Sequence, residues 1–338
     1  MGAARFPGRA AMLKAVAELA LAPAPGALIV HEAPEVVVLG SLNMDVAVRV
    51  PRAPEAGETL QARGLLASPG GKGANQAVAC ARQGARVCMV GKVGEDEHGA
   101  LLRAALHADG IDARHVSTQA GNTGTAFIVV DDQAQNRIVL LPGANAALCA
   151  EDAEVASSLF AAGPMLLLQL EVPMATVARA AQLARERGCR VVLNPSPMQP
   201  LPASLWPLLD ILIANAGEAQ ALCVCPITNV ADARQAAMAL RRRGPGLVLI
   251  TLGAEGVVVA DGQGCRHFDA LAVQAIDTTA AGDTFTGALC AALVAGASTD
   301  EAIQTGILAA ALCVTRAGAQ VSIPNARELV AFKKRVAV

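Results

Sequence analysis

Aromatic residues are scarce in this chain, and their scarcity limits what it can bind. Only 2% of the 338 residues are aromatic, with no Tyr, one Trp and six Phe. A surface on which nucleic-acid bases stack needs several exposed aromatic side chains. The 27 basic residues are balanced by 29 acidic ones and are scattered apart from two short runs. The sequence therefore predicts no nucleic-acid partner and a core built from Ala, Val and Leu.

Long apolar runs and paired cysteines are also missing. No apolar stretch reaches 18 residues without a charge or a helix breaker, so no membrane-spanning helix and no membrane partner are predicted. The nine cysteines are an odd number and contain no C-x-x-C pair, and the five histidines show no zinc-like spacing. We interpret the cysteines as reduced, buried small hydrophobic residues, and the protein as cytoplasmic.

Residues 1–34 differ from the rest of the chain. They carry Arg5, Arg9 and Lys14 before any acidic residue, and an Ala-Pro repeat follows. A targeting peptide is similarly basic and poor in acids, but here no apolar stretch is followed by a small-residue cleavage site. We interpret this segment as a poorly ordered extension, or as a start placed upstream of Met12, and expect a single domain over residues 35–338.

Short β-branched runs alternate with alanine-rich stretches from residue 36 onward. The expected strands are 36–40, 87–90, 165–170, 191–194, 211–214, 247–252 and 257–260, and the expected helices include 74–84, 97–109, 174–188, 231–243 and 283–296. This alternation predicts an α/β fold of three layers, α/β/α, with a mainly parallel central sheet. Residues 45–66 and 124–141 instead indicate exposed strands joined by turns, so we expect a small β-sheet lid over the carboxyl edge of the main sheet.

Two polar segments follow the first expected strand. Asn43 and Asp45 lie two residues apart, so an extended chain would point both side chains to one side, where they could hold a polyol. A solvated loop is the alternative. In segment 68–77 three glycines surround Lys72 and lead into an Ala-rich helix, whose free N–H groups favour an anionic or hydroxyl-bearing ligand. Its glycine spacing matches neither a Walker A loop nor G-x-G-x-x-G.

Segment 277–285 joins an expected strand, 273–276, to a helix with Asp283 in its first turn. The small-residue turn 280–282 would expose several N–H groups to an oxyanion. Asp283 beside these groups could accept a hydroxyl proton. The alternative is that Asp283 is a helix N-cap.

Two further turns follow expected strands. Asn215 and Glu218 could order a phosphate or hydrated magnesium, and a capping box explains their spacing nearly as well. The turn 251–256 suits a nucleotide that lies against the backbone, or is merely a β-turn.

These five segments, in this order, resemble the ribokinase family of sugar and nucleoside kinases, the PfkB carbohydrate kinases. The resemblance extends from about residue 36 to the end of the chain. Segment 70–79 is similar to the N-terminal signature of the family, 277–287 to its C-terminal signature and 215–218 to its N-x-x-E motif. The resemblance implies a ribokinase-like fold and transfer of the γ-phosphoryl group of ATP to O5 of D-ribose, with Mg²⁺ accompanying ATP and K⁺ as an activating cation.

The resemblance also implies roles for individual residues. Asp283 would be the general base, and the amides of Ala280, Ala281 and Gly282 would form the anion hole. The implied sugar contacts are Asn43, Met44, Asp45, Gly71, Lys72, Gly73, Ala74, Asn75, Glu171 and Asp283. The implied ATP contacts are Asn215, Thr251, Leu252, Gly253, Ala254, Glu255, Gly256, Gly282 and Asp283, with Glu218 acting indirectly on magnesium and phosphate. The implied ligands of the monovalent cation are Asp277, Thr279, Cys313, Arg316, Gly318 and Ser322.

The sequence leaves the substrate open. The commoner family signature has Gly where Ala280 stands, and Ile307, an expected neighbour of adenine, offers only apolar contact. A 2-deoxyribokinase is one alternative, because Met44 could tolerate a missing hydroxyl. A hexose or nucleoside kinase of the same fold is another. A catalytically silent sugar-binding regulator is a third, and the intact Asp283 argues against it.

The expected lid also predicts a homodimer. It carries apolar side chains at Val46, Val48, Leu65, Phe127 and Val129. A small sheet has two faces and only one can cover the sugar, so the other face or an edge is expected to pair with a second copy of the chain.

Overall fold

The structure is a computed structural model, and it describes residues 33–133 and 135–336. The chain from Pro34 onward forms one compact unit. The interpretation of residues 1–34 as an extension therefore lies almost entirely outside the described residues and stays a prediction. None of the described helices has both the length and the apolar character needed to cross a membrane.

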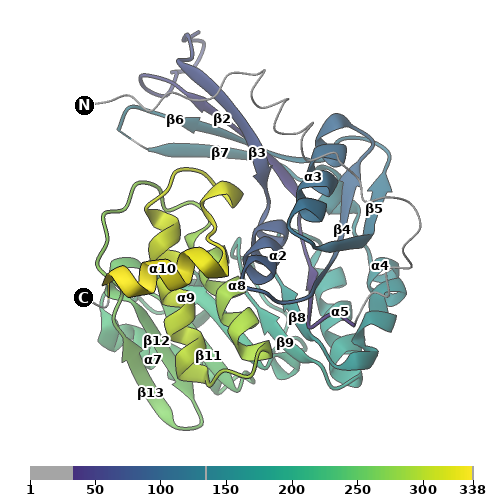
Figure 1. The fold of residues 1–338 in the computed structure, drawn as a ribbon, viewed down its shortest axis with the longest axis vertical. Coiled ribbons are helices and arrows are strands. Elements are labelled where there is room, and N and C mark those ends of the chain that lie inside the picture. The colour runs from purple at the N-terminus through teal and green to yellow at the C-terminus, as the bar shows by residue number, and fades with distance from the viewer. Residues whose placement is uncertain (1–32, 134, 337–338) are drawn as a thin grey trace. The chain divides into compact units, whose positions relative to one another are not determined.

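The centre of this unit is a nine-stranded sheet (Figure 1). Its strands are β1 (Val36–Leu39), β4 (Val87–Gly94), β5 (Asp112–Gln119), β8 (Met165–Leu168), β9 (Arg190–Leu193), β10 (Ile211–Asn215), β11 (Leu247–Thr251), β12 (Val257–Asp261) and β13 (Gly264–Phe268). The order is β13-β12-β11-β10-β9-β8-β1-β4-β5. All neighbouring pairs are parallel except those that β12 makes with β11 and β13. The expected mainly parallel sheet is confirmed.

Helices cover both faces of this sheet. Along β1, Val37 and Leu39 pack into the core on one face, and Val36 and Val38 pack into the core on the other. The first core is covered by α4 (Ala150–Val155), α5 (Met174–Glu186), α6 (Ala216–Cys223) and α7 (Val230–Arg241). The second is covered by α2 (Lys72–Arg82), α3 (Glu97–Ala108), α8 (Ala281–Val294) and α9 (Thr299–Val314), and α10 (Ala326–Val336) packs on α8 and α9. The three-layer prediction is therefore confirmed.

A second sheet of four strands forms the expected lid (Figure 1). It consists of β2 (Asn43–Arg49), β3 (Gly64–Gly70), β6 (Gly124–Val130) and β7 (Asn136–Leu141), in the order β3-β2-β6-β7. A lid strand was expected over residues 59–66, and its bounds were wrong, because the strand is Gly64–Gly70. Pairing of β2 with β3 runs from Asn43 opposite Gly70 to Arg49 opposite Gly64, so β2 is fully paired before residues 59–63 are reached.

The expected strand at 273–276 was also wrong. This segment has no regular structure, and the N–H groups of Ile276 and Asp277 both donate to the carbonyl of Val314, at 2.7 and 3.2 Å. These hydrogen bonds tie the end of the segment to the end of α9 and not to a strand of the large sheet. Two edge strands, β5 and β13, went unpredicted because their sequences are polar and have no apolar run.

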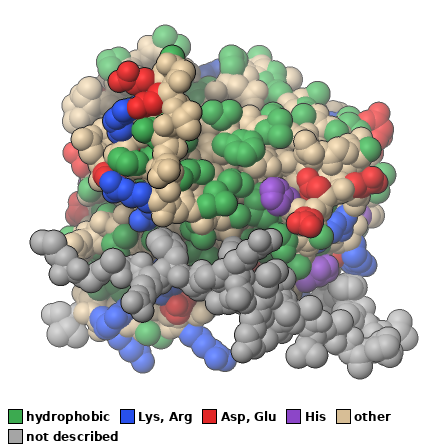
Figure 2. Space-filling model, turned by 90° about the horizontal axis from the view of Figure 1, so that it is seen from above, with side chains coloured by type: hydrophobic (Ala, Val, Ile, Leu, Met, Phe, Trp, Pro, Cys, Tyr) green, Lys and Arg blue, Asp and Glu red, His purple; other side chains and the backbone are tan. Residues whose placement is uncertain are grey.

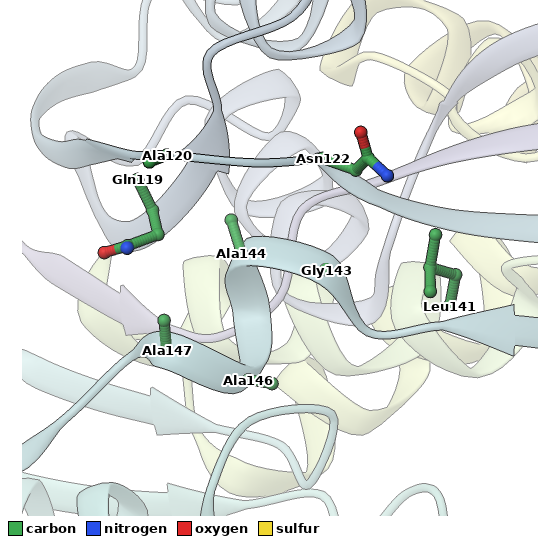
Figure 3. A pocket seen from close by; sticks show the side chains of 8 residues that line it. All are labelled: Gln119, Ala120, Asn122, Leu141, Gly143, Ala144, Ala146 and Ala147. Atoms are coloured by element: carbon green, nitrogen blue, oxygen red, sulfur yellow. The ribbon is translucent and has the colours of Figure 1, made fainter.

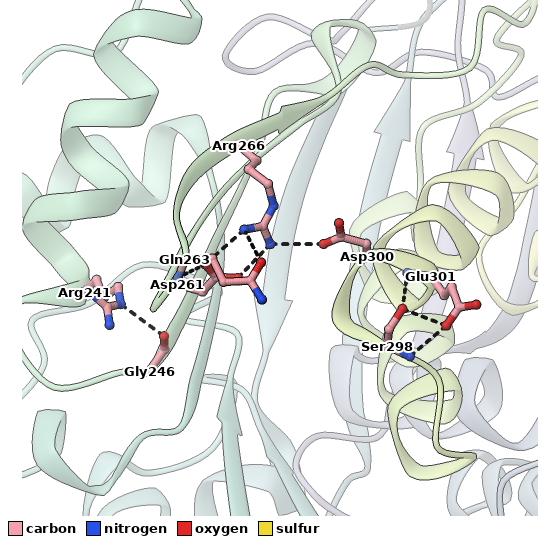
Figure 4. A network of polar contacts seen from close by, with 8 residues as sticks. All are labelled: Arg241, Gly246, Asp261, Gln263, Arg266, Ser298, Asp300 and Glu301. Carbon is pink, nitrogen blue, oxygen red and sulfur yellow. Dashed lines mark hydrogen bonds and ion pairs between the residues drawn. The ribbon is translucent and has the colours of Figure 1, made fainter.

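The β12–β13 hairpin is joined to the start of α9 by ionic contacts (Figure 4). Arg266 donates to Asp261 at 2.7 Å and to Asp300 at 3.0 Å. Ser298 and Glu301 form a capping box that begins α9. These contacts hold the antiparallel edge of the sheet against the helix pair α8 and α9.

Candidate active site

Some of the sequence-predicted site residues, among them Lys72, Asn215 and Asp283, meet where the carboxyl ends of the central strands face the starts of α2 and α8. A cavity of about 200 Å³ lies there. Its lining is polar, and it consists of Lys72, Asn194, Ser196, Ile213, Ala214, Asn215, Glu218, Thr251, Thr278, Ala280, Ala281, Gly282, Asp283 and Thr286. This is where a ligand is expected, because open α/β sheets bind their ligands in the crevice outside the carboxyl ends of the strands.

Both helices that begin at this site lack a side-chain cap. The residues before them, Gly71 and Ala280, have φ of 89° and 60°. At Gly71 a Cβ atom would lie 2.7 Å from the backbone nitrogen of Asn43, so only glycine allows this close approach. Ala280 occupies the left-handed region with a Cβ, at a cost of about 1–2 kcal/mol. At the start of α2 the N–H groups of Lys72, Gly73 and Ala74 are already bonded to Glu171 and Ser41. At the start of α8 the N–H groups of Ala280 and Gly282 have no protein partner in the part of the chain that the structure describes, and free N–H groups at a helix start favour an anionic ligand.

Asp283 is buried in the first turn of α8, with 7% of its surface exposed. It is not the N-cap, because the helix begins at Ala281. Its Oδ2 accepts a hydrogen bond from Asn75 Nδ2 at 3.0 Å, and its Oδ1 accepts one from Gln76 Nε2 at 2.9 Å. The carboxylate is thus held by two amides of α2 while it lines the cavity.

Glu171 gathers the polar groups at the base of the lid. Its Oε2 accepts hydrogen bonds from Ser41 Oγ at 2.5 Å, the backbone N–H of Lys72 at 3.0 Å and Asn43 Nδ2 at 3.3 Å. Ser41 Oγ in turn accepts the N–H of Gly73 at 3.2 Å. The loop after β8, the loop after β1 and the start of α2 are therefore fixed to one carboxylate.

Charged groups surround Asp45 on β2. Burial raises the pKa of Asp45, the charges of Glu171 and Asp283 raise it further, and Lys72 lowers it, which leaves a pKa of about 7. Burial alone would lower the pKa of Lys72, but the surrounding carboxylates, Asp283 first, outweigh it and raise that pKa. Lys72 is thus a cation held among carboxylates.

Only some of the residues expected to contact the nucleotide line the cavity. Asn215 Oδ1 accepts the N–H of Glu218 at 2.8 Å, and Glu218 Oε2 accepts the N–H of Asn215 at 2.9 Å. The capping box is therefore real, and both residues also line the cavity. Of the turn 251–256, only Thr251 lines the cavity. Leu252, Gly253, Ala254, Glu255 and Gly256 are not among its lining residues.

Three expected contacts are corrected by the structure. Met44 is 2% exposed and packs in the hydrophobic core, because alternation along β2 points it away from the face that carries Asn43 and Asp45. Ala74 is also core, and its N–H donates to the carbonyl of Ser41 at 2.9 Å. The N–H of Ala281 donates to the carbonyl of Thr278 at 3.2 Å, so it is already engaged within the turn.

Five of the six expected cation ligands lie in contact with one another. Asp277 accepts the N–H of Thr279 and the N–H of Gly318, each at 2.9 Å. Cys313 Sγ lies 3.0 Å from Ser322 Oγ and 3.7 Å from the carbonyl of Thr279. Burial opposes ionisation of Asp277, but its hydrogen bonds and the charge of Arg49 outweigh this and lower its pKa. The sixth, Arg316, directs its guanidinium to Glu328 at 2.8 Å.

Several residues of the candidate site were not predicted from the sequence. Gln76, Asn194, Ser196 and Thr286 touch Asp283 or line its cavity. Asn145 holds the start of β2, because it bonds the N–H and carbonyl of Leu42 and the side chain of Asn43. A signal existed for Asn194, a polar residue at the end of an expected strand. The others become visible only when distant segments meet.

A second and larger cavity, of about 400 Å³, lies at the root of the lid (Figure 3). It is lined by Gln119, Ala120, Asn122, Leu141, Gly143, Ala144, Ala146 and Ala147. None of these side chains is titratable, so the cavity offers no acid or base for catalysis. Within the described ranges, no three His, Cys, Asp or Glu side chains form a metal-binding group.

Comparison with known proteins agrees with this geometry. Residues 33–326 match the pfkB family carbohydrate kinase model. The chain is 43% identical to a ribokinase of Haemophilus influenzae over 296 residues, which is 87% of this chain and 97% of the relative. It is 32% identical to a deoxyribokinase of Salmonella typhi over 293 residues, which is 86% of this chain and 96% of the relative.

A solved structure shares the fold. The Arabidopsis thaliana ribokinase complexed with ribose and ATP superposes with a TM-score of 0.82 at 33% identity, over 90% of this chain and 99% of the other. The two helix starts, the buried carboxylate between them and the lid all lie within the matched part of the sequence. The chain belongs to the pfkB family of carbohydrate kinases.

Proposed function

We propose that this protein transfers the γ-phosphoryl group of MgATP to O5 of D-ribose, which gives D-ribose 5-phosphate. The observation that carries the proposal is the placement of Asp283, a buried carboxylate held by two amides at a helix start whose N–H groups face the cavity. The neighbouring ribokinases support the choice of sugar.

Each part of the site has a role in this reaction. Asp283 accepts the proton of the attacking hydroxyl, which makes the oxygen a better nucleophile. Asn43, Asp45, Lys72, Asn75 and Glu171 would hold sugar hydroxyls, with the backbone of Gly71 and Gly73. The amides of Ala280 and Gly282, which have no protein hydrogen-bond partner among the described residues, are available to the transferred phosphoryl oxygens.

The nucleotide would lie on the opposite side of the cavity. Asn215 and Thr251 line it there, and Glu218 is placed to order water around the magnesium of MgATP. The turn 252–256 does not line this cavity, so it would contact the nucleotide from beyond the edge of the cavity. Ile307 is half-buried and offers adenine an apolar neighbour.

A monovalent cation fits the two loops beside the anion-hole turn. Asp277 accepts the N–H groups of Thr279 and Gly318, which holds the two loops together. The carboxylate, hydroxyl and backbone oxygens of Asp277, Thr279, Gly318 and Ser322 would suit a hard cation such as K⁺. With Cys313 and Arg316 they would hold it through side-chain or backbone oxygens. The ion would supply positive charge next to residues 279–282, and these residues would aim their N–H groups at the phosphoryl oxygens.

The lid geometry supports the proposed homodimer. Strand register places Val46, Val48, Leu65, Phe127 and Val129 on one face of the small sheet, opposite the face of Asp45. Val139, paired with Phe127, is on the same face, and these two are 69% and 47% exposed. In the view onto the lid side, hydrophobic side chains gather in a group next to charged ones (Figure 2). Nine free cysteines further support a reducing, cytoplasmic location.

A substrate panel tests the proposed reaction. The rate of ADP release from MgATP is measured with each acceptor. We expect kcat/KM to be higher for D-ribose than for 2-deoxyribose, fructose and adenosine. The position of the phosphate is read from the product by NMR. Because residue 44 faces the core, the protein has no contact from that side chain with which to favour the deoxy sugar. Preference for 2-deoxyribose would identify a deoxyribokinase, and turnover of none of these would refute the kinase assignment.

A further inference from the structure

The buried amide of Gln76 lies between the proposed base and the core, and nothing in the sequence marked it. Gln76 has 0% of its surface exposed and follows Asn75 near the start of α2. Its Nε2 donates to Asp283 Oδ1 at 2.9 Å across 207 positions of sequence. A buried amide this far from solvent has to be satisfied by the protein.

Other hydrogen bonds fix which way the Gln76 amide faces. Its Oε1 accepts from Gln169 Nε2 at 2.6 Å, and its Nε2 also donates to Asn194 Oδ1 at 3.0 Å. Asn194 in turn donates through Nδ2 to the carbonyl of Ile213 at 2.8 Å, so its oxygen has to point at Gln76. Turning the Gln76 amide over would set its nitrogen against the donor of Gln169 and its oxygen against two acceptors, those of Asn194 and Asp283. The NH₂ group is therefore committed to Asp283.

This chain of amides connects Asp283 to the rigid part of the molecule. Gln169 follows β8, Asn194 follows β9 and Ile213 belongs to β10, three strands that are adjacent in the large sheet. Gly40 makes room for it, since a Cβ there would lie 2.0 Å from Gln169 Oε1. The orientation of the Asp283 carboxylate is thus fixed relative to the ends of three neighbouring strands.

We propose that Gln76 is a positioning residue, which fixes the rotation of the Asp283 carboxylate so that a free lone pair faces the sugar hydroxyl. Asn75 holds Oδ2 and Gln76 holds Oδ1, and both side chains are buried. Two donors on two different oxygens define the plane of the carboxylate, which one donor does not. This inference rests on the proposed function, since it assigns Gln76 to the work of Asp283.

The test is a double-mutant cycle of Gln76→Met with Asp283→Asn, measured with MgATP and the sugar that the wild type turns over. Met keeps the length of Gln and removes its amide. We expect Gln76→Met to lower kcat by about 10- to 100-fold, as misplacement of a catalytic group does, with KM for ATP within about threefold. In the Asp283→Asn background the same change should lower kcat by less than about twofold, because its effect passes through Asp283.

A matched control separates positioning from loss of stability. Thr176→Val removes the buried hydrogen bond from Thr176 Oγ1 to the carbonyl of Leu148, 2.8 Å long and remote from the cavity. It should lower Tm and leave kcat unchanged. An equal fall of kcat caused by Gln76→Met in both backgrounds would show a merely structural role and overturn the proposal. So would a wild-type kcat in the single variant.

Gln76→Glu covers the case in which Gln76→Met fails to fold. It keeps the shape and the acceptor for Gln169 but turns an acceptor toward Asp283, so kcat should fall at least as far. A near-wild-type kcat for Gln76→Glu would equally overturn the proposal. If the wild type phosphorylates no sugar, the proposed function fails before the cycle begins. Failure of the cycle in an active kinase refutes only the role of Gln76.

Discussion

At the scale of single residues, the carboxylates of the site differ in the groups that surround them. Asp283 is held by amides, Glu171 is held by a hydroxyl and two N–H donors, and Asp45 has few partners and is buried among like charges. These surroundings give chemically identical groups different tasks. Two predictions belong to this scale.

Replacement of Asp283 by Asn should remove the proton acceptor and keep the shape of the site. We expect a correctly folded protein with kcat lowered by about 10²- to 10⁴-fold, because loss of a general base has effects of that size. KM for MgATP should change little. Steady-state kinetics together with circular dichroism check this. Near-native kcat in a folded variant would show that Asp283 is not the base.

Protonation of Asp45 should weaken sugar binding below neutral pH. Its pKa of about 7 means that the carboxylate, which accepts hydroxyl protons, is mostly protonated at pH 6. We expect KM for the sugar to rise about tenfold from pH 8 to pH 6, whereas KM in Asp45→Asn should be high and independent of pH. A flat profile in the wild type would contradict this assignment.

The same shift has an opposite consequence for stability. A carboxyl group whose pKa is higher in the folded than in the unfolded protein binds its proton more tightly when folded. This group therefore stabilises the fold fully at low pH, and that contribution is lost as pH rises from about 4 to about 7. Binding and stability thus respond to Asp45 in opposite directions.

At the scale of helices and loops, the ends of elements carry most of the unusual backbone. Ala280 and Val224 are the two non-glycine residues with positive φ in the described part of the chain. Ala280 lies in the turn 280–282, the proposed anion hole, and backbone strain is a recurrent feature of functional sites. Val224 ends α6 in open solvent, and nothing in the structure explains a β-branched residue there.

Val224→Gly should therefore stabilise the protein. Val224 has φ of 53° and 92% exposure, so it pays for a left-handed conformation without burying its side chain. We expect the free energy of unfolding to rise by about 1 kcal/mol in urea titrations. Val155→Gly is the matched control, since Val155 is 71% exposed but has φ of −58°. It should destabilise by about 0.5–1 kcal/mol. A loss of stability in Val224→Gly would contradict the argument.

The two loops at Asp277 and Gly318 carry the prediction on potassium. We expect higher activity in K⁺ than in Tris at equal ionic strength, and a K⁺-dependent rise in Tm without substrates, because the ion would tie the loops together. Asp277→Ala should diminish both effects. Asp269→Ala, which removes a carboxylate with 95% exposure, should leave both in place. Equal rates and equal Tm in both buffers for the wild type would show that Asp277 only braces the turn.

At the scale of the whole molecule, the lid has a sugar-facing side and an apolar side. Because β7 is an edge strand exposed along its whole length, the apolar side is open to a second copy of the chain. A dimer formed there would also brace the sheet that covers the sugar. The proposed oligomer and the proposed catalysis are therefore linked through one small sheet.

Val139→Lys should convert the dimer to a monomer. Val139 is 69% exposed on the apolar side, and a lysine there would have to be buried without a partner. Light scattering at micromolar concentration should give the mass of two chains for the wild type and of one chain for the variant. Val330→Lys, 58% exposed on α10, should remain dimeric. A monomeric, fully active wild type would remove the proposed interface.

The amino-acid sequence by itself determined the layers of this protein and singled out residues of its candidate site. Strand and helix periods are local, so the parallel sheet and the lid segments could be predicted. Helix starts rich in glycine and alanine are local too, and they pointed to Lys72, Asn75 and Asp283, which lie at the starts of α2 and α8. The lid strand after residue 59 was misplaced, because register depends on the partner strand.

Only the tertiary structure decided how side chains from distant segments meet. Met44 was expected to contact the sugar and instead packs in the core. Alternation along β2 separates it from Asn43 and Asp45, and packing of the lid decided that the face of Met44 is the one buried against the core. Gln76 reaches Asp283 across 207 positions, and the pKa of Asp45 reflects charges from three other segments. Contacts and desolvation of this kind arise when distant segments pack together. The pattern of residues along the sequence does not give the distances between such segments.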